Sequence, residues 1–168
     1  MDERKLESER LFLKPLSFEE LLSIKIGMFE NIETLIEFEA ISDDVRLAIS
    51  KKIEKMKNIN KDIHEWYTYW LIIDKNKQYG IGFIGFKGIL YESAYSEVGY
   101  SISPNYRGRR LMTEALSLLI NWASKFPKCN GIKARVSKSN IGSNRVLTNC
   151  NFDFIDSVDD ENNYFYRL

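Results

Sequence analysis

The stretch from Pro104 to Leu116, PNYRGRRLMTEAL, constrains this chain more than any other segment. It joins a strand-like segment that ends at Ser103 to a helix-like segment that starts near Arg110, with a glycine among three arginines at the joint. Glycine adopts backbone conformations that a Cβ blocks, and the first turn of a helix leaves amide N–H groups without partners. Free amides, the helix dipole and guanidinium groups favour an anion-binding corner, with phosphate as the ligand. A turn glycine beside solvated arginines fits the same residues, so the stretch alone leaves both interpretations open.

Composition limits the partners that this chain can have. A chain of 168 residues is long enough to bury one core and short for two, so we expect a single domain over residues 1–168. Lys+Arg and Asp+Glu number 24 each, and a formal net charge of zero gives no global field toward nucleic acid or anionic lipid. The charged start MDERKLESER has no apolar h-region, and no apolar run reaches the roughly 18 residues of a membrane span. We therefore predict a cytoplasmic protein that binds neither nucleic acid nor membrane.

Cysteine and histidine usage gives no sign of a metal site. Cys129 and Cys150 lack metal-type spacing, and the single histidine, His64, has no partner in a C-x-x-C or H-x-x-x-H pattern. We predict no bound metal.

Local patterns in the first third predict a strand followed by two or three amphipathic helices. Residues 10–15 alternate apolar and polar side chains before a proline, as in a short edge strand. Ser17 and Glu20 form a capping box for the helix that follows. Residues 28–40 carry apolar side chains on one side and glutamates on the other, which suggests a short helix, and Ser42 favours the start of another.

The rest of the chain alternates strand and helix patterns. From Trp66 the period changes to two, so WYTYWLIID and YGIGFIGFKGIL, joined by KNKQ, predict an antiparallel hairpin, and Tyr95 to Ser103 a third strand. A helix that ends before Pro127, a strand over Gly131 to Val136, a short helix and a final hairpin complete the order. A meander followed by a crossover helix implies an α/β fold, in α+β style, with a mixed sheet flanked by helices.

Three glycines of the hairpin, Gly80, Gly82 and Gly85, satisfy the dinucleotide-binding pattern G-x-G-x-x-G. That chemistry requires a helix to begin at the glycines, but FKGIL follows them without a helical period. We interpret the glycines as bulges, or as places where another backbone or a ligand passes close to the strand.

Two separated motifs give the chain a family resemblance. YSEVGYSISPNYRGRRLMTEAL resembles the GNAT superfamily of acyl-CoA-dependent N-acyltransferases, in the branch that contains ribosomal-protein N-terminal acetyltransferases, where a strand E-V-G-Y-x-I-x-P leads into a pyrophosphate loop G-x-G-x-x-T-E-A. NIGSNRVLTNCNF is similar to that family's N-x-x-S-x-x-V-L-x-x-x-G-F. The resemblance implies a GNAT-type fold, whose central and mostly antiparallel sheet is splayed at the cofactor cleft. It places variable substrate-side helices at about residues 28–60 and the cofactor-binding core at about 95–152.

The chain departs from the family pattern at two loop positions. Asn151 replaces the glycine before the downstream aromatic residue, a mild change because asparagine tolerates a left-handed backbone. Arg110 stands where the loop has its second glycine. We expect its side chain to contact phosphate oxygens, together with Arg107 and Arg109.

The resemblance also implies a reaction and the residues that perform it. Acetyl-CoA would be the co-substrate, an amine would attack its thioester directly, and a main-chain amide near Tyr100 to Ile102, freed by a bulge at Gly99, would stabilise the oxyanion. The pyrophosphate would rest on the amides of Gly108 to Thr113. The predicted cofactor-binding residues are Tyr100, Ser101, Ile102, Arg107, Gly108, Arg109, Arg110, Leu111, Met112, Thr113 and Asn140.

Two residues are candidates for proton transfer. Glu97 is the candidate base, and a solvent-facing strand carboxylate is the alternative interpretation. Ser143 would protonate the leaving thiolate, or else cap a helix that begins near Asn144. Asn140 would contact the pantetheine amides or form an Asx-turn. We expect Glu114 to satisfy loop amides near the helix start.

The predicted function is acetyl-CoA-dependent N-acetylation of a primary amine, either a protein N-terminus or a small molecule. The alternative is a non-catalytic acyl-CoA-binding or protein-interaction domain of the same fold, because Arg110 departs from the loop pattern. The sequence leaves the oligomeric state open, a homodimer included.

Overall fold

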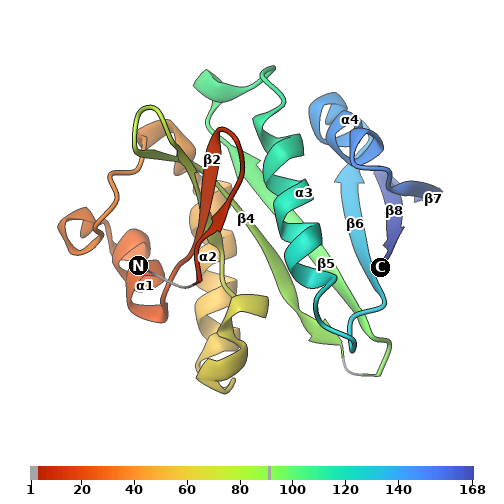
Figure 1. Cartoon of the computed structure of the whole chain (residues 1–168), viewed down its shortest axis with the longest axis horizontal. Helices are drawn as coiled ribbons and strands as arrows, with labels where there is room; N and C mark the ends of the chain where they lie inside the picture. The colour runs from red at the N-terminus through yellow and green to blue at the C-terminus, as the bar shows by residue number, and fades with distance from the viewer. Residues whose placement is uncertain (1–3, 91) are drawn as a thin grey trace.

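An eight-stranded sheet forms the middle layer of the fold, and helices cover both of its faces (Figure 1). The computed structural model describes residues 4–90 and 92–168. The strand order is β1-β2-β3-β4-β5-β6-β8-β7, and all neighbours are antiparallel except β5 and β6. The strands are β1 (Leu6–Glu7), β2 (Leu11–Pro15), β3 (Trp70–Asp74), β4 (Tyr79–Leu90), β5 (Tyr95–Ile102), β6 (Gly131–Ser137), β7 (Asp153–Val158) and β8 (Glu161–Arg167). The α-helices are α1 (Phe18–Ile26), α2 (Asp43–Met56), α3 (Leu111–Ala123) and α4 (Ile141–Asn149), and the 3₁₀ helices are η1 (Phe29–Asn31), η2 (Phe38–Ala40), η3 (Lys61–Trp66) and η4 (Pro104–Tyr106). The predicted mixed sheet is confirmed.

Local sequence signals set the helices of the first third. Ser17 and Glu20 form the predicted capping box, and Gly27 ends α1 in a left-handed conformation with φ of 81°. The Ser42 hydroxyl accepts the N–H of Val45 at the start of α2. Both helices therefore begin where short-range capping predicts.

Three expectations about the first half of the fold are wrong. Residues 28–40 form no α-helix: they contain η1 and η2, and between these turns Glu37 N–H donates to Gly80 O at 2.8 Å, so the chain runs extended beside β4. β2 is not an edge strand, because β1 pairs with its outer side. Trp66 belongs to η3 rather than to a strand, and its ring packs against Phe86 and Trp122.

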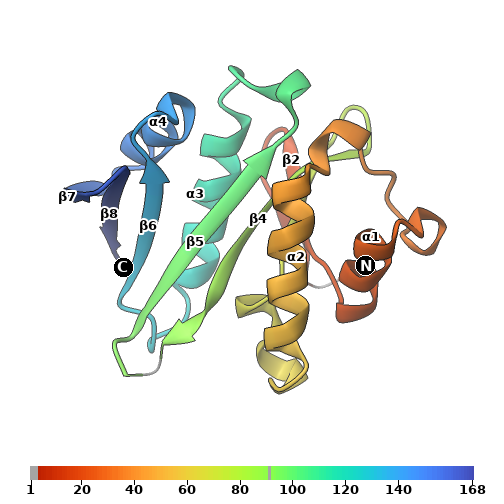
Figure 2. The same cartoon turned by 180° about the vertical axis from the view of Figure 1, so that it is seen from behind.

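Two hydrophobic cores lie on the two faces of the sheet. The larger one packs α3 and α4 against the sheet and includes the buried Trp70, Ile84, Phe86 and Leu116. The smaller one packs α1 and α2 on the opposite face, as the reverse view shows (Figure 2). Each face of the sheet thus carries its own helical layer, and each layer borders one of the pockets described below.

Among the strands in residues 4–90 and 92–168, the one parallel pair is β5 with β6, and this pairing is short. It joins Tyr95, Ser96 and Glu97 to Gly131, Ile132 and Lys133. Beyond these pairs the two strands diverge (Figures 1 and 2). The predicted splay of the sheet is confirmed.

After Glu97, the edge of β5 that faces β6 has no strand partner among the described residues. The N–H of Ser103 donates to Ile81 O on β4 at 2.8 Å, and alternate residues of a strand present their N–H groups to the same side. The N–H groups of Tyr100 and Ile102 therefore face away from β4, toward the diverging β6. The predicted bulge at Gly99 is wrong, because Gly99 pairs regularly with Gly85 and the irregularity lies in β4 between Phe86 and Ile89. The free amides of β5 result from the splay.

Lys52 connects α2 to the sheet from inside the protein. Its ammonium group donates to Phe86 O at 2.7 Å and to Tyr67 O at 3.1 Å, and the side chain is buried. Burial is the main cause that lowers its pKa to about 7, and the charges of Lys55 and Lys87 lower it further.

Stability should therefore rise with pH between 7 and 9 in a way that depends on Lys52. In this range the unfolded lysine keeps a proton that the folded lysine has lost, so the free energy of unfolding gains at most about 1.4 kcal/mol per pH unit from this group. Lys52→Met should remove this contribution, and Lys51→Met, which changes the exposed neighbour, should retain it. Chemical denaturation at pH 7, 8 and 9 measures the difference. Equal pH slopes for the wild type and Lys52→Met would contradict the assignment.

Candidate active site

A cleft of about 690 Å³ is lined by the end of β5, the loop before α3 and the first turns of α4. The structure brings together most of the predicted site residues in its wall. Those present are Tyr100, Ser101, Ile102, Arg107, Gly108, Arg110, Leu111, Met112, Thr113, Asn140 and Ser143. Two predicted residues, Arg109 and Glu97, do not line the cleft.

The loop before α3 contains two left-handed residues. Gly108 has φ of 73° and Arg110 has φ of 60°. The second value gives a backbone reason for the family's glycine at this position, because a left-handed conformation is strained for most residues with a Cβ, arginine included. Arg110 is also the N-cap of α3, and its side chain makes no capping hydrogen bond.

The N-terminus of α3 points free donors toward the cleft region. The first hydrogen bond of the helix runs from Glu114 N–H to Arg110 O at 3.1 Å, so the amides of Leu111, Met112 and Thr113 have no partner within the helix. These three residues line the cleft. Unpaired amides at the positive end of a helix are a suitable site for an anion.

The charges in the cleft wall are all positive. Arg107, Arg110 and Arg145 line it, and no carboxylate does so among the residues that the structure describes. In the same part of the chain no ion-pair partner of these guanidinium groups is found. Sequence reasoning missed Arg145, although its place on the second turn of the helix after Asn140 could have indicated it. Arg109 instead lies near the ring of Tyr106, with 5.4 Å from its guanidinium carbon to the ring centroid.

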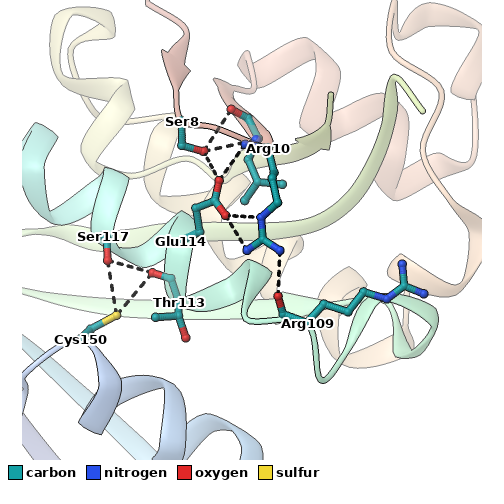
Figure 3. A network of polar contacts seen from close by, with 8 residues as sticks. Ser8, Arg10, Arg109, Thr113, Glu114, Ser117 and Cys150 are labelled. Atoms are coloured by element: carbon teal, nitrogen blue, oxygen red, sulfur yellow. Dashed lines mark hydrogen bonds and ion pairs between the residues drawn. The ribbon is translucent and has the colours of Figure 1, made fainter. Parts of the chain in front are cut away.

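Polar contacts connect the N-terminal hairpin, formed by β1, β2 and the turn between them, to the loop before α3 and to the first turn of α3 (Figure 3). Glu114 Oε1 accepts the Ser8 hydroxyl at 2.6 Å and the Arg10 N–H at 2.9 Å, and Oε2 accepts Arg10 Nε at 2.7 Å. Arg10 also donates through Nη1 to Arg109 O at 3.1 Å. The guanidinium of Arg10 thus connects the first turns of α3 to the loop backbone.

The expected role of Glu114 is therefore corrected. Its carboxylate accepts from Ser8 and Arg10, not from loop amides. Partial burial raises the pKa of Glu114, but hydrogen bonds from Ser8 and Arg10 and the charge of Arg10 outweigh burial and hold the pKa below its ordinary value. The carboxylate stays ionised at neutral pH, as the ion pair with Arg10 requires.

Asn140 is the N-cap of α4, where Ser143 was an alternative candidate. The Asn140 side-chain oxygen accepts the Ser143 N–H at 3.1 Å, and α4 begins at Ile141 rather than near Asn144. Ser143 is the third helical residue, and its carbonyl accepts the Tyr100 hydroxyl at 3.2 Å. Ser143 therefore does not cap the helix, and it is one of the residues that line the cleft.

Glu97 lies at the point where β5 and β6 part, since its pairing with Lys133 is the last of the ladder. Its carboxylate pairs with Lys87 and, at 3.2 Å, with Arg135. Partial burial raises the pKa of Glu97, but the hydrogen bonds and charges of Lys87 and Arg135 outweigh it and hold the pKa below its ordinary value. Glu97 is therefore ionised, and its proton affinity is reduced.

A second pocket of about 600 Å³ lies on the α2 side of the sheet. Gly85 of β4 and Gly99 of β5 are directly opposite each other and line it together with Tyr67 and Tyr69. Lys87, which pairs with Glu97, also lines it. The pocket therefore borders β5 at Gly99, on the face of the sheet that α2 covers. Helices α2 and α3 lie on opposite faces of the sheet (Figure 2).

Within residues 4–90 and 92–168, no helix is long and apolar enough to cross a membrane. No group of three or more His, Cys, Asp or Glu residues in these ranges could hold a metal ion.

Comparisons with known proteins agree with this architecture. The uncharacterized N-acetyltransferase YjdG of Bacillus subtilis (strain 168) is 31% identical over 86 residues, 51% of this chain and 51% of the relative. The chain thus spans about half the length of the curated relatives it matches.

Solved structures resemble the whole chain. The ribosomal-protein-S5-alanine acetyltransferase from Vibrio fischeri has a TM-score of 0.67 at 18% identity and covers 97% of this chain and 96% of its own. RimL, a ribosomal L7/L12 α-N-protein acetyltransferase in complex with coenzyme A, has a TM-score of 0.69 at 14% identity, with 98% of both chains covered. At these identities the two structures show a shared fold.

The sequence also matches a family model. The match to the acetyltransferase (GNAT) domain runs over residues 10–153, which include β2, the residues that line both pockets and the first residue of β7. The chain therefore belongs to the GNAT acetyltransferases.

Proposed function

We propose that the chain is an N-acetyltransferase that transfers the acetyl group of acetyl-CoA to a primary amine by direct attack, the amine being a protein N-terminus or a small molecule. The observation that carries this proposal is the cleft beside the open edge of β5: three arginines and the unpaired amides of α3 line it, and no carboxylate does so in the described part of the chain. Membership of the GNAT family and the coenzyme A complex of RimL support it.

The residues of the cleft fit both the pyrophosphate and the pantetheine arm of acetyl-CoA. The amides that follow Gly108, together with Arg107 and Arg110, would hold the pyrophosphate. The unpaired backbone of β5 from Tyr100 to Ile102 would pair with the amides of pantetheine, as a strand partner does. Acetyl-CoA supplies an activated thioester to this site.

Residues near the point where β5 and β6 separate would stabilise the oxyanion and transfer protons during the reaction. The N–H groups of Tyr100 and Ile102 that face the splay are candidates to stabilise the oxygen that becomes negative as the amine attacks. A new N–C bond forms as the C–S bond breaks, the amine loses a proton toward Glu97 directly or through water, and Ser143 donates a proton to the leaving thiolate. The reduced proton affinity of Glu97 favours a route in which water carries the proton onward.

A thiol-release assay with acetyl-CoA and a panel of amines tests the proposed function. The wild type should release coenzyme A above background, and Glu97→Gln should lower turnover about a hundred-fold while leaving acetyl-CoA affinity nearly unchanged. Glu19→Gln, at an exposed position of α1, is the matched control. Cofactor binding without thiol release across the panel would favour the non-catalytic alternative, and unchanged turnover in Glu97→Gln would remove Glu97 from the mechanism.

Arg110→Gly separates the backbone role of this residue from its charge. Glycine relieves the left-handed strain, so the free energy of unfolding should increase by up to about 1 kcal/mol. The loss of the guanidinium should nevertheless weaken acetyl-CoA binding about ten-fold, because a charge-assisted hydrogen bond to phosphate is lost. Calorimetric titration and thermal denaturation measure the two effects. Binding as tight as wild type would show that the Arg110 side chain points away from the phosphates.

Arg10→Ala tests the network behind the loop. Without Arg10, Glu114 loses a partner and the Arg109 carbonyl loses its donor, so the phosphate loop should become less ordered and KM for acetyl-CoA should rise about five- to ten-fold, more than kcat falls. Arg4→Ala removes an ion pair with Glu65 in the same hairpin region and is the control. Arg10→Lys should restore only part of the affinity, since one ammonium cannot contact both the Glu114 carboxylate and Arg109 O as the guanidinium does. An unchanged KM in Arg10→Ala would limit the network to a structural role.

A further inference from the structure

The pocket on the α2 side of the sheet is locally basic although the chain as a whole is neutral. Its charged lining residues are the lysines Lys51, Lys52, Lys55 and Lys87 and the acids Asp44 and Glu54. Glu54 is already paired with Lys57 at 2.7 Å. Lys87 is paired with Glu97, so among the described lining residues Lys51 and Lys55 face Asp44 as the one lining carboxylate that is not paired with another lysine.

The lysines also lie close enough to disfavour one another. Lys55 donates to Lys87 O at 3.2 Å, which brings an α2 ammonium to the backbone of β4. After burial, the charges of Lys55 and Lys87 are the causes that lower the pKa of Lys52. Lys51 is exposed, and within the described residues no ion pair engages it. A bound negative charge would relieve this repulsion.

The pocket is also placed to deliver an amine to the reaction. Gly85 and Gly99 leave its sheet wall without side chains at the level where they pair. Glu97 precedes Gly99 by two residues and contacts Lys87, so the candidate base stands at the border of the pocket. The rest of the wall is largely carbon, from Leu47, Ala48 and the two tyrosine rings.

We infer that this pocket selects acceptor amines that carry carboxylate groups, either acidic peptides or acidic amino acids. The inference rests on the proposed function and names the class of its acceptor. The carboxylates would pair with Lys51 and Lys55 at the α2 side, and the amine would lie toward Gly99 and Glu97. The positive surroundings also favour the neutral, nucleophilic form of the amine, because nearby like charges lower the pKa of an ammonium group.

The test compares acceptors of different charge, among which the Asp and Asn peptides are matched in size. Three amidated peptides begin with Ala and continue with two Asp, two Asn or two Arg residues, and free aspartate is a fourth acceptor. The Asp peptide should show kcat/KM about ten-fold above the Asn peptide and further above the Arg peptide, and the preference should shrink at high salt. Aspartate turned over better than the Asp peptide would assign the site to small amino acids.

A charge reversal locates the preference. Lys51→Glu combined with Lys55→Glu should reverse the order of the Asp and Arg peptides, whereas Lys125→Glu, at an exposed position outside the pocket, should not. Circular dichroism checks the fold of each variant. If the double variant fails to fold, the ratio of kcat/KM for the Asp peptide to kcat/KM for the Arg peptide, measured on the wild type, still tests the inference.

The outcomes separate this inference from the proposed function. Thiol release with equal kcat/KM for all three peptides would overturn the inference and leave the function standing. If no acceptor is acetylated, the proposed function fails, and fluorescence anisotropy of peptides labelled at the C-terminus decides the inference alone. In that measurement the Asp peptide should bind the wild type at least ten-fold more tightly than the Arg peptide, and equal affinities would overturn the inference.

Discussion

The short pairing between β5 and β6 is the constraint on which the site depends. Three residue pairs, ending at Glu97 and Lys133, join the two halves of the sheet before the strands separate. If β5 and β6 were paired along their whole length, the N–H groups of Tyr100 and Ile102 would be hydrogen-bonded to β6 and the cleft would be closed. Without any pairing, no backbone hydrogen bonds would fix the position of one half of the sheet relative to the other. α3 crosses between the two strands and packs on the larger core, so the divergence is held by hydrophobic burial rather than by hydrogen bonds.

The loop at the open end of the splay is strained and is supported from elsewhere in the chain. A left-handed arginine opens α3 without a side-chain cap, which leaves the helix amides available but costs stability. Arg10 and Ser8, about a hundred residues earlier, bind Glu114 and the backbone of Arg109 (Figure 3). The donors of this support come from the turn between β1 and β2, so we expect the order of the loop to depend on that turn as well as on the loop's own sequence.

Sequence reasoning succeeded where the determining contacts are local, and it failed where they are distant. The capping box of α1, the Ser42 cap of α2, the apolar stripes of both helices and the start of α3 depend on residues a few positions apart. Residues 28–40 have a helical pattern, yet the Glu37 N–H donates to Gly80 O and the chain there is extended. No residue near Glu37 in the sequence indicates this contact. Ser143 and Asn140 compete for one cap within three residues, and only the placement of α4 decides between them. The role of Glu114 was missed because Arg10 lies 104 residues away.

The two pockets would let a chain of zero net charge bind the two charged substrates that we propose. Arginines and the N–H donors of a helix start lie on the α3 side, and lysines lie on the α2 side. Both pockets include residues of β5, so two ligands bound on opposite faces would meet across one strand, next to Glu97. Glu97 is held between Lys87, from the α2-side pocket, and Arg135 of β6. Because Glu97 contacts a lysine of the second pocket, a change of charge in that pocket should change the proton affinity of its carboxylate.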